Sequence, residues 1–188
     1  MKLSPKFEEA LIYATRMHGG QIRKKTNIPY IGHLLGVCAI AMEYGANETE
    51  AIAALLHDVV EDCGGAARQR EIDEKFGREV GAIVAGCTDT DQTPKPPWRE
   101  RKENYIAHLR TASASTRLVS ASDKLHNAQA IVHNLREHGG DIWGYFKAGK
   151  EGALWYYRSL VTALREHGSN ALIDELDRVV SEMERLAS

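Results

Sequence analysis

Apolar residues recur at helical spacing along most of this chain, and Gly, Pro and capping residues interrupt the pattern. In the first segment, the apolar positions between Phe7 and Ala14 share one helical face, which Pro5 can begin and Gly19 can end. No stretch shows the strong two-residue alternation that is typical of a half-buried β-strand. The sequence therefore predicts an all-α protein, a compact bundle of about eight to ten helices.

The interruptions also predict where the helices lie. Asn47, with Glu50 three residues later, is expected to cap one long helix that ends near Cys63, and Ser115 is expected to cap a later one. The segment 89–97 is polar and proline-rich, so we expect a loop there. The predicted helical ranges are 5–17, 29–44, 48–63, 71–76, 78–87, 98–109, 116–137, 150–167 and 170–186.

Composition narrows the class of protein. With 188 residues, 43% of them hydrophobic and 27% charged, the chain suits one globular domain and is not disordered throughout. A net charge of −2 gives no overall positive field for binding nucleic acid. The three cysteines are widely spaced, and neither a signal peptide nor a membrane span is evident. We therefore expect a soluble cytoplasmic protein that binds neither nucleic acid nor membrane.

The sharpest candidate site is the segment His57–Asp62, which follows the apolar run Ala51–Leu56. On one continuous helix, the side chains of its four ionisable residues fall within an arc of about 140°. Carboxylates are costly to bury unless they meet a cation. The segment is therefore either the solvated face of an amphipathic helix or part of a metal site.

Two further segments favour the metal site. His33 lies in an otherwise apolar helix and Asp123 lies early in another, where a packed histidine and an aspartate paired with Lys124 are the ordinary alternatives. Together with His57 and Asp58, they form a mixed nitrogen and oxygen set that suits Mn²⁺, Fe²⁺ or Mg²⁺, with Zn²⁺ also allowed. An octahedral ion held by four such ligands keeps positions open for water and substrate.

The order of these four residues resembles the H…HD…D signature of HD-domain metal phosphohydrolases. The chain resembles the hydrolase domain of RelA/SpoT proteins more closely still, through the segments H-x-G-Q-x-R-K, P-Y-I-x-H, L-L-H-D-x-x-E-D and D-[RK]-L-x-N. These segments occur in family order at 18–24, 29–33, 55–62 and 123–127. The resemblance covers a core of about 3–135, with 140–188 as a helical extension of the same single domain 1–188. The 188 residues leave no room for a synthetase domain. The resemblance therefore indicates a stand-alone small alarmone hydrolase.

The resemblance implies roles for the motif residues. The four signature residues would bind one Mn²⁺ ion, other divalent ions being possible. Glu61 and Asp62 would be the catalytic residues, facing the attacking water and the scissile phosphate. One would act as base and the other as acid, and the sequence leaves that assignment open. The implied reaction removes pyrophosphate from the 3′ position of (p)ppGpp, leaving GDP or GTP.

Substrate binding is expected to depend on a local group of cations, because a net charge of −2 gives no overall positive field. By resemblance, Arg23 and Lys24 line the nucleotide pocket and Asn127 contacts the sugar or its surroundings; a solvated basic loop is the alternative for the two cations. Arg99 and Lys102 are expected to close over the diphosphates, with a charged helix face as the alternative. The candidate nucleotide-binding residues are Arg23, Lys24, Lys25, Asn127, Arg99 and Lys102.

Some positions depart from the family pattern and leave other functions open. The segment 25–27, Cys63 and Ala130 can alter the pocket around the base or sugar, so (p)ppApp is an alternative substrate. A general HD nucleotidase or phosphodiesterase, or a nucleotide-binding regulator without turnover, are further alternatives. His126 is not expected to be a metal ligand, because adjacent helical residues point about 100° apart and its neighbour is Asn127. The sequence does not indicate the oligomeric state.

Overall fold

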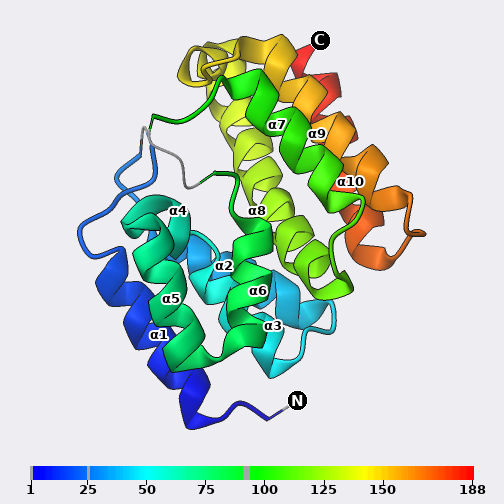
Figure 1. Ribbon diagram of the computed structural model, residues 1–188. Helices are drawn as coiled ribbons and strands as arrows, with labels where there is room; N and C mark the ends of the chain where they lie inside the picture. Colours follow the sequence, from blue (N-terminus) through cyan, green and yellow to red (C-terminus); the bar gives the residue numbers. More distant parts are fainter. Residues whose placement is uncertain (1, 25, 91–93) are drawn as a thin grey trace.

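The computed structural model describes residues 2–24, 26–90 and 94–188. It confirms an all-α fold: this part of the chain holds helices and an isolated antiparallel bridge between Ile22 and Pro29, but no β-strand (Figure 1). The elements are α1 (Pro5–Met17), α2 (Ile31–Glu43), α3 (Glu48–Leu56), α4 (Val59–Cys63), α5 (Gly65–Phe76), α6 (Arg78–Cys87), α7 (Trp98–Leu109), α8 (Ala114–His138), the 3₁₀ helix η1 (Gly139–Tyr145), α9 (Gly149–Arg165) and α10 (Ala171–Ala187).

Capping residues fix several helix ends as the sequence predicts. Asn47 and Glu50 form a reciprocal capping box at the start of α3, and both α1 and α7 have the predicted bounds. The cap of α8 was predicted wrongly, because the side chain of Ser113, not that of Ser115, accepts the backbone N–H of Thr116. Helix α5 also begins at Gly65, earlier than predicted.

The single long helix predicted to end near Cys63 is wrong, because the chain breaks at His57 and Asp58. The imidazole Nδ1 of His57 donates to the carbonyl of Ala54 over 2.9 Å. A continuous helix would offer that carbonyl to the backbone N–H of Asp58. Asp58 has φ −96° and ψ −6°, well away from regular helical values. The histidine and the aspartate therefore lie at a helix junction, where their side chains can turn toward one point.

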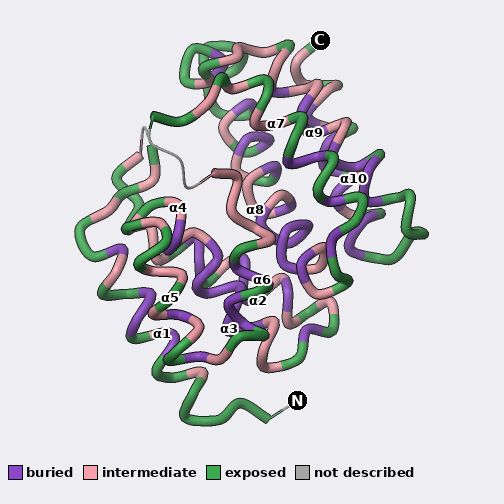
Figure 2. Tube along the Cα trace, viewed as in Figure 1, coloured by how far each residue is buried: buried purple, intermediate pink, exposed green. Residues whose placement is uncertain are grey.

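Helix α8 is the central element, and it packs against α2, α3, α6, α9 and α10 (Figure 1). One buried core is formed by α1 to α6 and includes Val119 of α8. The other is formed by α7, α9, α10 and η1 and includes Leu125 and Ile131 of α8. Figure 2 shows many buried residues along α2 and α3 and along parts of α8. On α8, Asp123 is flanked by Ala121 and Leu125 of the second core, and Val119 of the first core lies one turn earlier.

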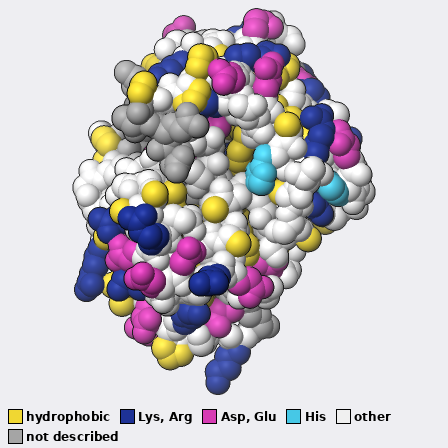
Figure 3. Space-filling model, in the orientation of Figure 1, with side chains coloured by type: hydrophobic (Ala, Val, Ile, Leu, Met, Phe, Trp, Pro, Cys, Tyr) yellow, Lys and Arg dark blue, Asp and Glu magenta, His cyan; other side chains and the backbone are white. Residues whose placement is uncertain are grey.

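The face shown in Figure 3 carries interspersed cationic and anionic side chains and no broad surface of one sign. No helix in the described ranges has the length and apolar character needed to cross a bilayer.

We expect Leu34→Ala to lower the free energy of unfolding by about 2–5 kcal/mol, because Leu34 is 0% exposed and its loss leaves a cavity in the first core. Leu35→Ala is the matched control: Leu35 is the next residue of α2 and is 45% exposed, so the change should stay within about 0.5 kcal/mol. Urea unfolding of both variants measures the difference, and equal losses would contradict this placement of α2.

Candidate active site

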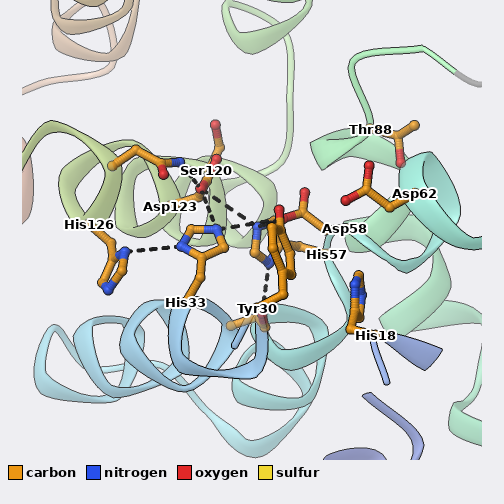
Figure 4. A network of polar contacts seen from close by, with 12 residues as sticks. His18, Tyr30, His33, His57, Asp58, Asp62, Thr88, Ser120, Asp123 and His126 are labelled. Carbon is orange, nitrogen blue, oxygen red and sulfur yellow. Dashed lines mark hydrogen bonds and ion pairs between the residues drawn. The ribbon is translucent and has the colours of Figure 1, made fainter. Parts of the chain in front are cut away.

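Four side chains from three parts of the chain meet at one point (Figure 4). His33 comes from the first turn of α2, His57 and Asp58 from the α3–α4 junction, and Asp123 from α8. Ligand atoms of His33, His57 and Asp58 all lie within 4.8 Å of one another. Asp123 is not part of that trio, but its Oδ1 lies 3.2 Å from Nε2 of His33 and 3.6 Å from Nε2 of His57. The sequence-predicted ligand set is therefore assembled around both imidazoles.

The donor set fits a divalent cation. Because Nδ1 of His57 donates to the Ala54 carbonyl, the neutral ring carries a lone pair on Nε2. That Nε2 is buried, makes no hydrogen bond within the described residues, and lies 3.0 Å from Oδ2 of Asp58. In the neutral ring this lone pair would face a carboxylate oxygen, which is repulsive, and a proton or a metal ion bound between the two atoms removes the repulsion. Two imidazole nitrogens and two carboxylate oxygens are suitable ligands for such an ion.

The electrostatics also favour positive charge at this point. Burial acts to lower the pKa of His57, but the carboxylates of Asp58 and Asp123 outweigh it and raise that pKa well above its usual value. Burial acts to raise the pKa of Asp123, but the Lys124 ammonium and the two imidazoles outweigh it and hold that pKa well below its usual range. Both carboxylates therefore stay ionised and available as ligands.

Partners outside the set orient the ligands. The hydroxyl of Tyr30 donates to Oδ2 of Asp58 over 2.6 Å. On the other side, Nδ1 of His126 lies 3.0 Å from Nδ1 of His33. Sequence reasoning missed both roles. For His126 a signal was available, since Asp123 and His126 are three residues apart and so share a helical face.

The two candidate catalytic carboxylates have different partners. Oδ2 of Asp62 accepts a hydrogen bond from the Gln21 amide over 2.9 Å, and Oε1 of Gln21 accepts one from Nδ1 of His18 over 2.7 Å. Glu61 pairs with Lys95, whose ammonium lies 2.7 Å from Oε1. Gln21 and Lys95 had not been assigned these roles from sequence. The H-x-G-Q part of the first motif thus supports Asp62.

The basic loop is connected by hydrogen bonds to the candidate metal ligands. Backbone hydrogen bonds from Arg23 to Ile28 and from Tyr30 to Gln21 fold the loop back on itself. The guanidinium of Arg23 donates to the Asn127 side chain over 2.9 Å, and Asn127 in turn donates to Asp123 over 2.5 Å.

The remaining candidate cations lie in different surroundings. Lys24 is exposed, and Lys25 lies outside the described residues. Lys102 is paired with Asp89 at 3.0 Å, and burial together with the nearby charges of Lys124 and Arg101 lowers its pKa to about 7. Arg99 instead lies over the ring of Trp155 and pairs with Glu103, neither of which is a candidate site residue. Closure of Arg99 and Lys102 over a diphosphate stays a prediction.

We expect Tyr30→Phe to weaken divalent metal binding about 10-fold, because Asp58 loses the hydrogen bond that orients it. Tyr44→Phe, at the other end of α2, is the control and should bind as the wild type does. Titration calorimetry with Mn²⁺ measures both, and unchanged affinity in Tyr30→Phe would show that the hydroxyl does not support the site.

Comparisons with known proteins identify the family of this chain. The family profile described as HD domain matches residues 10–154. The Drosophila melanogaster protein named guanosine-3′,5′-bis(diphosphate) 3′-pyrophosphohydrolase MESH1 is 34% identical over 70% of this chain and 72% of its own length. The GTP pyrophosphokinase rsh of Brucella ovis is 34% identical over 65% of this chain, but the match spans only 16% of that protein.

Solved structures extend the likeness to the whole fold. A metazoan ortholog of SpoT, described as hydrolysing ppGpp, has a TM-score of 0.80 and 29% identity, covering 100% of this chain and 99% of its own. The protein lmo0812 of Listeria monocytogenes EGD-e has a TM-score of 0.71 and 31% identity, covering 79% of this chain and 96% of its own. The chain belongs to the HD domain family, in the RelA/SpoT-type branch that includes MESH1.

Proposed function

We propose that this chain is a Mn²⁺-dependent 3′-pyrophosphohydrolase that converts (p)ppGpp to GDP or GTP and pyrophosphate. The observation that carries the proposal is the convergence of His33, His57, Asp58 and Asp123. Glu61 and Asp62 follow on α4, directly after the junction that holds His57 and Asp58. MESH1 is named as a pyrophosphohydrolase of guanosine-3′,5′-bis(diphosphate), and the metazoan SpoT ortholog is described as hydrolysing ppGpp. Both descriptions support the same reaction for this chain.

In the proposed mechanism, His33, His57, Asp58 and Asp123 hold the ion. A bound divalent ion supplies an activated water nucleophile and offsets the negative charge of the phosphates. Water adds to the phosphorus next to the ribose, the bond from that phosphorus to the 3′ oxygen breaks, and pyrophosphate leaves. The departing 3′ oxygen is a poor leaving group and needs a proton.

Glu61 and Asp62 are the proposed proton carriers. The amide of Gln21 engages only Oδ2 of Asp62, which leaves the other carboxylate oxygen to meet water or substrate. Lys95 pairs with Glu61 and so places an ammonium group beside this carboxylate. One carboxylate takes a proton from the attacking water, and the other protonates the 3′ oxygen.

Local cations are the proposed substrate ligands. Arg23 can fork onto a phosphate or stack on the purine, and its bond to Asn127 aligns it with the metal site. Lys24 and Lys25 extend this positive loop. Lys102 would act from the α7 side, where it pairs with Asp89. Arg99 would have to leave Trp155 to reach a phosphate.

The base is left to experiment, and (p)ppApp is the alternative substrate. We also propose a cytoplasmic setting, which the free thiols of Cys38, Cys63 and Cys87 support because disulfides are rare in reducing compartments.

Incubating the purified protein and Mn²⁺ with ppGpp, ppApp, GTP and cyclic nucleotides, then resolving the products, tests the proposal. Pyrophosphate released from ppGpp, from ppApp or from both supports it and identifies the base. Products from common or cyclic nucleotides alone indicate a general HD nucleotidase or phosphodiesterase instead. Tight binding without any product indicates a non-catalytic regulator.

We expect Glu61→Gln to retain Mn²⁺ affinity and to lower kcat by about 10²–10⁴-fold, because the amide cannot transfer a proton. Glu74→Gln on α5 is the matched control, since Glu74 is exposed and is not a candidate site residue. Steady-state kinetics with calorimetry of metal binding separates the two effects. Normal turnover in Glu61→Gln would exclude a proton-transfer role for this residue.

A further inference from the structure

His126 contacts a proposed metal ligand from the side opposite the metal site (Figure 4). Its Nδ1 lies 3.0 Å from Nδ1 of His33, and the two ring centroids are 4.9 Å apart. His126 stands three residues after Asp123 on α8, so the same face of that helix presents a carboxylate to one nitrogen of His33 and an imidazole to the other.

The hydrogen bond between the two rings determines which nitrogen of His33 can bind a cation. The Nε2 atom of His33 points at the carboxylates, 3.2 Å from Asp123 and 3.5 Å from Asp58. A metal at this point requires a lone pair on Nε2, so the neutral His33 ring must carry its proton on Nδ1. That proton is then donated to a lone pair on Nδ1 of His126, whose own proton is on Nε2.

The space for the His126 ring exists because residue 36 is glycine. A Cβ added to Gly36 would lie 2.3 Å from both Cδ2 and Nε2 of His126, a distance that no packed pair tolerates. Glycine inside a helix costs stability relative to alanine, so its presence in the middle of α2 needs a packing reason. Gly36 is also three residues after His33, and the two therefore share the face that meets α8.

We propose that His126, seated against Gly36, is a positioning residue that holds His33 in the orientation and tautomer needed to bind a divalent cation. The inference rests on the proposed function in one respect, that His33 is a metal ligand. It gives a role to a histidine that contacts a proposed metal ligand and lies outside the proposed ligand set.

The first test compares two substitutions of His126 by calorimetry with Mn²⁺. His126→Leu removes the acceptor and should weaken Mn²⁺ binding about 10–100-fold. His126→Asn places an amide oxygen near the position of Nδ1, so it can accept the proton of His33, and it should stay within about threefold of the wild type. Should His126→Leu fail to fold, His126→Ala supplies the same comparison. Equal affinity in all variants would overturn the proposal.

The second test uses the glycine. Gly36→Ala should displace the His126 ring and weaken Mn²⁺ binding as His126→Leu does. In the His126→Ala background, the same change should have no further effect, because the ring that it would strike is absent. Gly32→Ala, one turn earlier on α2, is the matched control: its Cβ would meet Ile28 at 3.7 Å, an ordinary contact. Additive losses of Mn²⁺ affinity from the two substitutions would contradict the proposed packing of His126 against Gly36.

A spectroscopic measurement separates positioning from a general loss of structure. In ¹⁵N-correlated NMR spectra of the metal-free protein at a pH where His33 is neutral, the wild type and His126→Asn should show its proton on Nδ1. His126→Leu should show a mixture of tautomers, and an unchanged tautomer there would count against the proposal. Wild-type protein that binds Mn²⁺ but hydrolyses no alarmone would overturn the proposed function alone. Wild-type protein that binds no Mn²⁺ would overturn this inference.

Discussion

The central physical constraint on this structure is the convergence of two buried imidazoles and two carboxylates, because such a group requires positive charge between its members. Nε2 of His57 lies 3.0 Å from Asp58 without a hydrogen bond of its own, and Asp123 approaches both rings. Such a group is unfavourable by itself and favourable around a cation. The fold holds it together through α8, which contributes residues to both hydrophobic cores and carries Asp123.

The surrounding residues give each ligand a defined direction. Tyr30 donates to Asp58, the Ala54 carbonyl accepts from His57, and Lys124 pairs with Asp123. In metal sites of proteins, such outer partners fix tautomers and ring orientations and tune ligand basicity. The motif residues that flank the ligands in sequence are therefore part of the same site, although they are not expected to touch the ion.

The loop between α1 and α2 links the metal site to the proposed chemistry. One end supplies Gln21, which engages Asp62, and the middle supplies Arg23, which reaches Asn127 on α8. Its other end supplies Tyr30. A short segment thus orients a candidate metal ligand, a proposed proton carrier and a proposed nucleotide ligand together.

The sequence by itself determined the helical class, most helix bounds and the order of the motif residues, because caps and apolar periodicity act over one or two turns. It could not reveal the break at His57 and Asp58, since the bond from the His57 ring to Ala54 depends on where the ring is held. The sequence also could not predict the ion pair between Glu61 and Lys95 or the packing of His126 against Gly36. Those contacts join elements far apart in the chain, and only the packing of α2, α8 and the segment before α7 decided them.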